Sequence, residues 1–428
     1  MGSIFFLLLA VVACSGTATP GPTAVASSSG TATPSQIPTA SRTVVATTSP
    51  TPSPTPTLSP TASPRPMAPA TLKTGPKMTI AREGQAAVRL ADGRVLIMGG
   101  TVPFVGKCPM ACIEPATASV EVYNPRTGKF THNGSLAEAR SDAKALLLSD
   151  SRVLVVGGGY GAPVETMEIY NPATGTSNVV KLPANLASLP EEAEIALLAN
   201  GRVLIAGGSY DRDESTSNAT LIFDPASGAF SDGPLMAKAR EGAPATLLDD
   251  GRVLIAGGEY VKGGYGVANA SVELIDPSNP LSQSTLLMTQ DYPGTSTLLS
   301  DGRVLITEWG SYDSGAGCGN PGVSEIFDPR TESFTPVGPM ITPRTGSTAV
   351  KIQDGRVLLF GGVDASCAAL GTVEAFDPDS GTFQVVATGF PKITDFSATL
   401  LGDGRILIAG GSNGAWDQMT AASWLLEP

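Results

Sequence analysis

The chain has 428 residues and a formal net charge of −12, with 15% charged and 42% hydrophobic residues. The hydrophobic share is ample for a folded core. The negative charge argues against nucleic acid or an anionic membrane surface as a partner, because both require a basic patch.

The first 14 residues resemble an export signal. Ile4 to Ala13 is an apolar stretch that is too short to span a bilayer. It ends at Val11-Val12-Ala13-Cys14, which resembles a bacterial lipobox. That resemblance implies cleavage before Cys14 and lipidation of its thiol, and therefore an exported protein that touches the membrane only through a lipid anchor. A plain secretory peptide with an incidental cysteine is the alternative.

Residues 15–70 are rich in Thr, Ser, Pro and Ala and have almost no charge. Such a segment cannot bury enough apolar surface to fold. Its prolines favour an extended conformation, so we expect a disordered, stiff linker that holds the following domain away from the membrane.

Seven near-copies of one phrase run through residues 71–428. The first copy reads Asp92-Gly-Arg-Val-Leu-Ile-Met-Gly-Gly. The copies are marked by Arg94, Arg152, Arg202, Arg252, Arg303, Arg356 and Arg405. Steps of 49 to 58 residues between these arginines predict one four-stranded blade per copy. The sequence therefore predicts an all-β fold, a seven-bladed β-propeller.

The local chemistry of each copy predicts the inner two strands of a blade, whose four strands we call a to d. Apolar runs such as Ala245 to Leu248 predict strand a, and Val253 to Ala256 predicts strand b, buried on both faces. The Asp-Gly between them tolerates positive φ at both central turn positions, as a tight hairpin requires. Gly257-Gly258 then ends strand b and lets backbones approach closely.

A second signature predicts the outer two strands. Its first copy reads Glu121-Val-Tyr-Asn-Pro-Arg-Thr-Gly-Lys-Phe, and it recurs at Glu168, Leu221, Glu273, Glu325 and Glu374. Strand c ends at the proline, a Thr/Ser-Gly turn reverses the chain, and an aromatic residue opens strand d.

The double glycine followed by a spaced aromatic pair, Tyr123 and Phe130 in the first copy, resembles a kelch repeat, and the resemblance covers residues 71–428. Kelch-type propellers include copper oxidases whose metal requires a pair of histidines. This chain has one histidine, His132, which argues against that mechanism and against a Ser/His/Asp hydrolase.

The two ends of the repeat array predict how the ring closes. The last copy stops at strand c, Leu425 to Pro428, and residues 72–82 align with the strand d that begins at Phe230. We therefore expect the N-terminal segment to complete blade 7 and to remove an exposed sheet edge.

Four cysteines remain after Cys14, and an even number in an exported protein indicates disulfides. Cys108 and Cys112 share one loop of blade 1, whereas Cys318 and Cys367 occupy the same loop in the neighbouring blades 5 and 6. We expect the pairs Cys108–Cys112 and Cys318–Cys367. A metal site is the alternative, although the spacing lacks a second CxxC.

Candidate ligand-binding residues lie where the blades stop repeating. Aromatic rings in the loops between strands b and c could form an arc that stacks on sugars or peptides, or could pack as a lid. Blade 5 replaces Ala-Gly-Gly by Thr-Glu-Trp, which predicts either a pocket wall or a plug. The residues concerned are Tyr160, Tyr210, Tyr260, Glu308, Trp309, Tyr312 and Trp416.

Arginines and carboxylates also recur just before strand a. Arg82, Arg140, Arg240 and Arg344 stand twelve residues before their repeat arginines, and Asp142, Glu192 and Asp395 stand ten before theirs. Near one opening of the channel, these guanidinium groups would suit a carboxylate ligand. The alternative is that each arginine pairs with an acid of the scaffold.

Two functions follow from the resemblance. Kelch domains mostly bind other molecules, which implies a monomeric, surface-tethered module for a protein or glycan, with no cofactor and no metal. The alternative is a metal-independent mutarotase or epimerase similar to the kelch-type sialic acid mutarotase. In that case Glu192 or Glu308 would act as acid/base, and Arg240 or Arg344 would anchor a carboxylate. We expect binding rather than catalysis.

Overall fold

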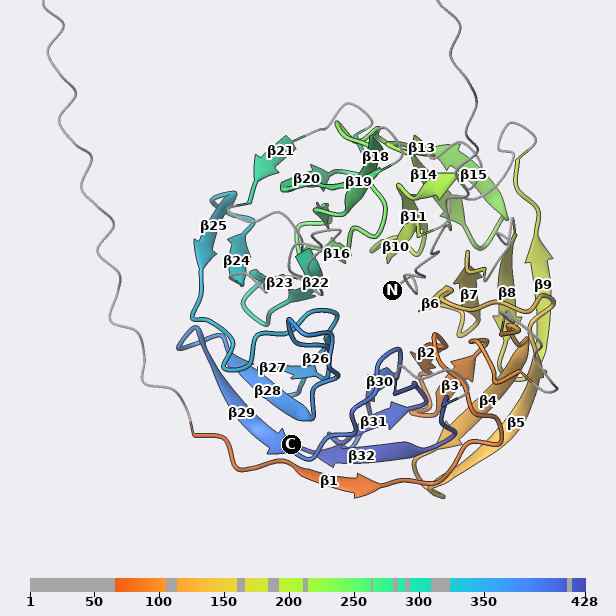
Figure 1. Ribbon diagram of the computed structural model, residues 1–428. Coiled ribbons are helices and arrows are strands. Elements are labelled where there is room, and N and C mark those ends of the chain that lie inside the picture. The colour runs from red at the N-terminus through yellow and green to blue at the C-terminus, as the bar shows by residue number, and fades with distance from the viewer. Residues whose placement is uncertain are drawn as a thin grey trace, which may run out of the picture. The chain divides into compact units, whose positions relative to one another are not determined.

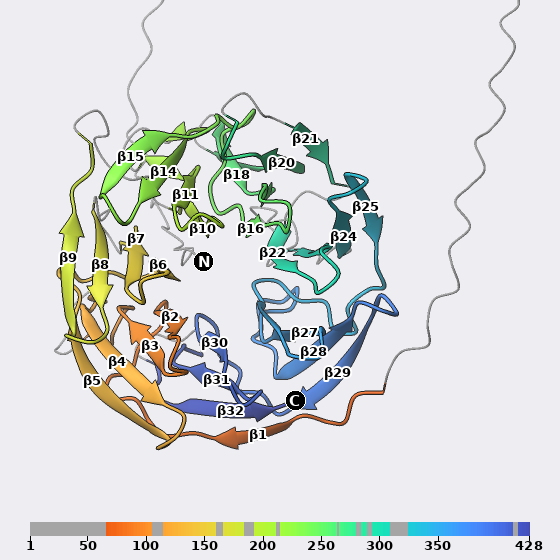
Figure 2. The same ribbon diagram turned by 180° about the vertical axis from the view of Figure 1, so that it is seen from behind.

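The computed structural model describes residues 66–104, 114–159, 166–183, 192–210, 215–262, 265–279, 284–288, 293–308, 324–413 and 418–428. Within these ranges, seven four-stranded antiparallel sheets form a ring around a central channel (Figure 1), which Figure 2 shows from behind. The prediction of a seven-bladed β-propeller is confirmed. In the same part of the chain, no helix is long and apolar enough to cross a membrane.

Each sheet is one blade, and its strands run from the channel outward in the order a, b, c, d. The a strands are β2 (Ala86–Arg89), β6 (Lys144–Leu147), β10 (Glu194–Leu197), β16 (Ala245–Leu247), β22 (Pro293–Leu298), β26 (Thr348–Lys351) and β30 (Ser397–Leu400). The b strands are β3 (Val95–Met98), β7 (Val153–Val156), β11 (Val203–Ala206), β17 (Val253–Ala256), β23 (Val304–Glu308), β27 (Val357–Phe360) and β31 (Ile406–Ala409).

The outer strands follow the same order around the ring. The c strands are β4 (Ser119–Asn124), β8 (Met167–Asn171), β14 (Thr220–Asp224), β20 (Ser271–Ile275), β24 (Glu325–Asp328), β28 (Thr372–Asp377) and β32 (Ser423–Glu427). The d strands are β5 (Lys129–Ser135), β9 (Thr176–Val180), β15 (Ala229–Asp232), β21 (Ser284–Leu287), β25 (Ser333–Pro336), β29 (Thr382–Thr388) and β1 (Thr71–Thr74).

Two short hairpins extend the loops between strands b and c of blades 3 and 4. They are β12 (Ser209–Tyr210) with β13 (Ser215–Thr216), and β18 (Glu259–Lys262) with β19 (Tyr265–Ala268). Strands β13 and β18 lie in contact, so the two hairpins are neighbours.

The core lies between neighbouring blades. The b strands β3, β7, β11, β17, β27 and β31 are buried over their whole length, as their continuous apolar sequences predict. One hydrophobic cluster joins Leu96 and Val120 of blade 1 to Val153 and Tyr170 of blade 2. Burying each such side chain stabilises the fold by about 1.5–3 kcal/mol, so every blade depends on the next.

The hairpin between strands a and b differs from the predicted turn. In blade 1 the amide of Gly93 donates to the Leu90 carbonyl, and the Leu90 amide donates to the Arg94 carbonyl. Only the glycine has positive φ, +88°, so this is a three-residue loop with one left-handed residue and not a two-residue turn with two. Ser151 takes the left-handed position in blade 2, with φ +68°.

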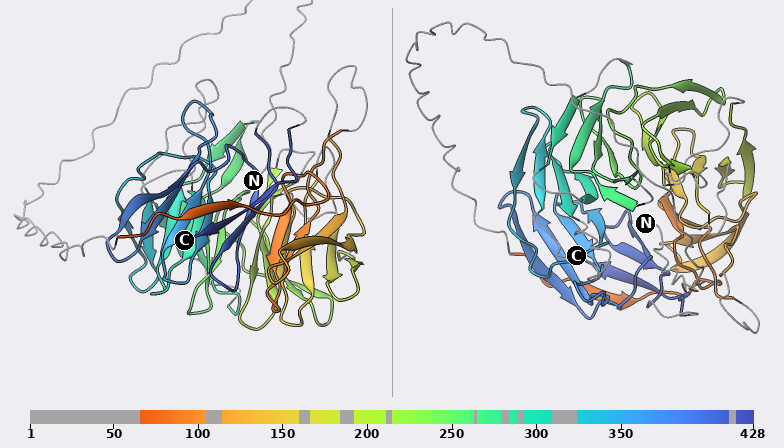
Figure 3. Two further views of the ribbon diagram at one scale, coloured as in Figure 1. Left: turned by 90° about the horizontal axis from the view of Figure 1, so that it is seen from below. Right: turned by 45° about the horizontal axis from the view of Figure 1, so that its top comes forward.

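The predicted closure of the ring is confirmed. Strand β1 pairs antiparallel with β32 from Thr71↔Glu427 to Thr74↔Trp424, and thereby becomes strand d of blade 7. Just before it, the Ala70 amide donates to the Val386 carbonyl of β29 at 2.7 Å, so the N-terminal segment joins blade 6 to blade 7. Figure 3 shows β1, in orange-red, crossing the outer side of these two blades.

Leu72 tests this closure, because its partly buried side chain packs against the apolar cluster of blades 6 and 7. We expect Leu72→Asp to lower the free energy of unfolding by about 2 kcal/mol, since it loses apolar burial and brings a charge against that cluster. Urea denaturation measures the difference. The control is Lys73→Ala, which removes an exposed ion pair with Glu427 and should cost less than about 1 kcal/mol. Equal midpoints for both variants would contradict the role given to β1.

Candidate functional site

The arginines before strand a are scaffold residues. Each donates from Nη2 to the glutamate of strand c in its own blade, at 3.0 Å in blade 1, 2.7 Å in blade 2, and 2.6 Å in blades 4 and 6. These ion pairs are Arg82–Glu121, Arg140–Glu168, Arg240–Glu273 and Arg344–Glu374. All eight side chains are at most 2% exposed.

Each ion pair is completed by backbone groups, as blade 4 shows. Nη1 of Arg240 donates to the carbonyls of Gly257 and Ser271 at 2.7 and 2.8 Å. Glu273 in turn accepts from the backbone amides of Ala237 and Lys238. The pair therefore fixes the incoming loop, the end of strand b and the start of strand c in one arrangement.

The double glycine is explained by the neighbouring blade. In blade 1 the Gly100 amide donates to the Arg140 carbonyl of blade 2 at 2.9 Å. A Cβ on Gly99 would lie 2.3 Å from that same carbonyl oxygen, which no side chain could tolerate. Gly207 meets the Arg240 carbonyl at the same 2.3 Å, so these glycines allow blades 1 and 3 to approach the arginine of the next blade.

These contacts correct one prediction. Arg240 and Arg344 were expected to bind a ligand at the channel opening, but they are 1% and 0% exposed and their charge is already paired inside the blade. Burial lowers the pKa of Arg240, and the attraction of Glu273 opposes that shift. The alternative, that these arginines pair with acids of the scaffold, is the arrangement that the structure contains.

Carboxylates gather at the channel opening on the face of the propeller that carries the b–c and d–a loops, which we call the loop face. In blades 1, 2, 3, 4, 6 and 7 a residue just before the a strand has positive φ, and the non-glycine residues there are Asp142 (+55°), Glu192 (+52°) and Asp395 (+54°). Gly84 takes this position in blade 1: its amide donates to the Asp395 carbonyl, and its carbonyl accepts from the Asp142 amide. Backbone hydrogen bonds thus link the left-handed residues of blades 7, 1 and 2 in a row around the opening.

Two carboxyl groups at this opening have strongly raised pKa values. Burial raises the pKa of Glu83 to about 7, with repulsion from Asp395, Glu114 and Asp142 adding to the shift and a hydrogen bond from Ser412 opposing it. Burial likewise raises the pKa of Asp142 to about 6, and Asp395 and Glu192 repel its negative charge. Perturbed carboxyl groups of this kind are typical of functional sites.

The acidic cluster extends to blade 4. Burial raises the pKa of Glu259, the first residue of β18, and repulsion from Glu192 adds to it. Lys144 of strand β6 pairs with Glu194 of strand β10 at 2.7 Å, and this attraction raises the pKa of the lysine. We call Glu83, Asp142, Glu192, Glu259 and Asp395 the acidic opening.

The structure brings together only some of the predicted ligand-binding residues. Tyr260 lies partly buried on β18, and Tyr210 lies on β12 of the adjacent hairpin. Glu192 lies exposed at the acidic opening, and Glu308 is the last residue of β23. The other aromatic candidates lie outside the described residues: Tyr160, Trp309, Tyr312 and Trp416.

His132 lies exposed on the outer strand β5. Cys367 lies in an exposed turn with φ +64°. Cys14, Cys108, Cys112 and Cys318 lie outside the described residues, so lipidation and both cysteine pairings stay predictions. In the described ranges, no group of three or more His, Cys, Asp or Glu side chains is arranged to hold a metal ion.

Sequence reasoning missed Glu83 and Glu259. Glu83 stands next to Gly84, at a position that is Ser141, Glu191, Glu241, Tyr292, Thr345 and Thr394 in the other blades, so a carboxylate occurs in only three of the seven copies. Glu259 directly follows a double glycine, which was interpreted only as the end of a strand. The only sequence signal for these two glutamates was their place beside positions whose residues differ from blade to blade.

Comparison with known proteins supports the architecture. Residues 344–389, which make up most of blade 6, match the Kelch motif. A fungal alcohol oxidase of the AA5 family, solved in complex with copper, aligns with a TM-score of 0.63 and 16% identity over 83% of this chain and 76% of that chain. No curated protein matches the sequence. At this identity the likeness shows the propeller fold.

Removing one partner of a buried ion pair should destabilise the propeller. We expect Glu273→Gln to lower the free energy of unfolding by about 3–5 kcal/mol, because Arg240 would keep a buried charge without its counter-ion. The double variant Arg240→Met/Glu273→Leu should recover part of this loss. Arg330→Ala, which breaks an exposed pair with Asp328, is the control and should cost less than about 1 kcal/mol. Denaturant midpoints that are equal for Glu273→Gln and the control would refute the assignment.

The raised pKa of Asp142 predicts how stability depends on pH. The folded-state pKa, about 6, exceeds the ordinary value of 3.8, so the folded protein holds this proton more tightly than the unfolded chain. Its contribution to stability is therefore present below about pH 4 and is lost as pH rises towards 7. We expect Asp142→Asn, which tolerates the left-handed backbone, to be more stable than the parent by about 1–2 kcal/mol at pH 8 and equal to it near pH 4.

Thermal unfolding of both proteins between pH 4 and pH 8 measures this difference. The exposed Asp232→Asn on β15 serves as the control and should follow the parent at every pH. A constant offset between Asp142→Asn and the parent across this range would rule out titration of Asp142 as the cause.

Proposed function

We propose that this chain is a binding module that holds a protein partner through the loop face of its propeller. Kelch propellers are generally interaction modules, and the present fold is of that kind. The observation that carries the proposal is the acidic opening, where five carboxyl groups from blades 1, 2, 3, 4 and 7 face one region.

The charge of this region suggests the chemistry of the partner. Burial, with repulsion from neighbouring carboxylates, raises the pKa values of Glu83, Asp142 and Glu259, so a positive charge placed among them would relieve an existing cost. Lysine or arginine side chains of a partner supply that charge. Tyr260 of the neighbouring hairpin offers aromatic surface beside it, which also suits a glycan.

The place of the module in the cell follows from the N-terminal sequence. The lipobox-like residues around Cys14 and the Pro/Ser/Thr-rich segment 15–70 support an exported protein that is tethered to a membrane by lipid. The disulfides Cys108–Cys112 and Cys318–Cys367 belong to the same proposal, because an oxidising compartment would favour them.

An isomerase acting on a sugar is the second candidate. The observation that favours it is the pair Glu83 and Asp142, whose pKa values of about 7 and 6 suit proton transfer near neutral pH. The arginine anchors that this function would require are buried in the scaffold, so these two carboxyl groups alone support it. Turnover of a sugar anomer that is abolished by Glu83→Gln would favour the isomerase over the binding module.

Charge removal at the acidic opening tests the binding function. Binding of Lys/Arg-rich, acidic and neutral peptides and of a glycan array is compared for the parent and for Asp142→Asn/Glu192→Gln/Asp395→Asn. We expect the basic peptides to bind, the variant to weaken their binding about tenfold, and added salt to weaken it in the parent.

The matched control removes three exposed carboxylates away from the opening, through Asp232→Asn/Glu332→Gln/Glu427→Gln. It removes the same number of negative charges and should leave binding within about twofold of the parent. Equal weakening by both triple variants would mean that net charge, and not the acidic opening, attracts the peptides. If glycans bind and all peptides fail to bind, the ligand is a glycan, and the hairpin that carries Tyr260 becomes the expected binding surface.

A further inference from the structure

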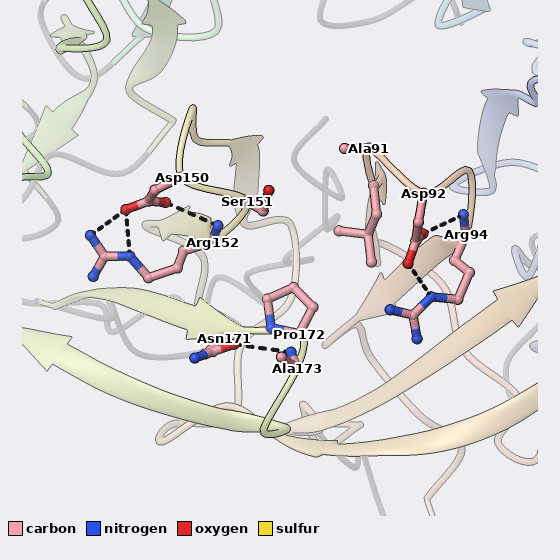
Figure 4. Close-up of a pocket in the computed structure, with 10 residues that line it drawn as sticks. Ala91, Asp92, Arg94, Asp150, Ser151, Arg152, Asn171, Pro172 and Ala173 are labelled. Carbon is pink, nitrogen blue, oxygen red and sulfur yellow. Dashed lines mark hydrogen bonds and ion pairs between the residues drawn. The ribbon is translucent and has the colours of Figure 1, made fainter.

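A cavity lies on the face opposite the loop face, where the a–b hairpins and the c–d turns meet. It has a volume of about 420 Å³ and lies between the hairpins of blades 1 and 2 and the c–d turn of blade 2 (Figure 4). Asp92, Arg94 and Ser151 of the hairpins face Asn171 and Pro172 of the turn. This volume falls in the range of about 300–1,000 Å³ that small-ligand sites occupy.

The hairpin arginines normally close this region between blades. Nη2 of Arg152 donates to the Pro225 carbonyl in the c–d turn of blade 3, at 3.1 Å. The same bond joins Arg252 to Pro329 at 2.9 Å and Arg303 to Pro378 at 3.2 Å. In blades 6 and 7, Nη2 donates instead to the aspartate of the same hairpin, in the pairs Arg356–Asp354 and Arg405–Asp403.

Arg94 departs from this pattern. Its Nε donates to Asp92 at 2.7 Å, but within the described residues neither of its terminal amino groups has an acceptor. The carbonyl that it would reach by analogy, that of Pro172, accepts from Nδ2 of Asn133 at 3.2 Å. Nδ2 of Asn133 also donates to the Tyr170 hydroxyl at 2.8 Å, which holds the amide in place. Of the six Asp-containing hairpins, this is the one whose arginine has no acceptor in the described ranges for either terminal amino group, and it borders the cavity together with the hairpin of blade 2.

The terminal amino groups of Arg94, which have no acceptor among the described residues, indicate the chemistry of the ligand. Two amino groups of one guanidinium match the two oxygens of a carboxylate in a planar, bidentate geometry. Asp92 and Asp150 at the cavity are each paired with the arginine of their own hairpin, so the four charges sum to zero. A group with one negative charge is therefore accommodated more readily than a phosphate with two. The side chains of Leu90 and Pro172 supply apolar wall for a short aliphatic portion.

We propose that the cavity between blades 1 and 2 is a binding site for a small monocarboxylate, held by the guanidinium fork of Arg94. The carboxylate belongs either to a free aliphatic acid or to the C-terminus of a peptide segment. This site is independent of the acidic opening, because the two lie on opposite faces and prefer opposite charges.

Titration calorimetry on the full chain tests the site with propionate, with the tripeptide Gly-Ala-Ala as the free acid, and with its C-terminal amide. We expect the free acid to bind and the amide to bind at least about tenfold more weakly, because the amide lacks the charge and the second acceptor oxygen. Propionate that binds as tightly as the tripeptide identifies a free acid as the ligand, whereas a tighter tripeptide identifies a peptide terminus.

Variants of the hairpin arginines locate the binding. Arg94→Gln should abolish it, and Arg94→Lys, which keeps the charge but not the fork, should weaken it at least about fivefold. Arg303→Gln is the matched control, since it changes the same hairpin position in blade 5 and should leave affinity unchanged. Thermal unfolding confirms that each variant is folded. Absence of saturable binding, equal binding of acid and amide, or undiminished binding by Arg94→Gln would each overturn the proposal.

Discussion

The buried ion pair between the arginine of the incoming loop and the glutamate of strand c, present in blades 1, 2, 4 and 6, organises this propeller. In blade 2, the side chain of Arg140 donates hydrogen bonds to Glu168 and to backbone carbonyls of its own blade. The backbone carbonyl of Arg140 accepts a hydrogen bond from the amide of Gly100 in blade 1. One residue therefore fixes the inside of a blade and its distance from the previous blade. Desolvation makes such a pair costly to form alone, and the surrounding backbone hydrogen bonds satisfy most of its donors and acceptors, although Nε of Arg82, Arg140 and Arg240 is buried without an acceptor among the described residues.

The ring also shows what happens where the pair is missing. In blade 7 the arginine position is Ile393 and the glutamate position is Trp424, and both pack in the apolar cluster of blades 6 and 7. An apolar contact thus replaces the ionic one, as expected if the scaffold requires a well-filled space and not a charge. This same blade receives its last strand from the N-terminal segment, so the closure depends on strand pairing and apolar packing.

The remaining charges divide between the two faces. On the loop face, left-handed backbone places Asp142, Glu192 and Asp395 around one opening, where burial, with repulsion between carboxylates, raises the pKa values of Glu83 and Asp142. On the opposite face, each Asp-containing hairpin holds its own arginine, which leaves little net charge there. A partner with positive charge and a small monocarboxylate therefore suit different faces. Both proposals rely on positions where one blade departs from its neighbours, because the repeated residues are explained by the scaffold.

The sequence by itself determined the blade count, the strand positions and the closure by residues 71–74, because periodic apolar runs, double glycines and turn residues act locally or repeat at a fixed interval. It did not determine the turn type at Asp92-Gly93, which depends on how the paired strands twist. It also did not determine whether the side chains of Arg240 and Arg344 lie at the channel or inside a blade, because both arrangements have the same local sequence. Only the tertiary structure brought Glu83 and Glu259 into the acidic opening, as these residues come from different blades. It also decided that Asn133 takes the carbonyl of Pro172 and leaves the guanidinium of Arg94 open, a competition between side chains that lie close together only after the blades have packed.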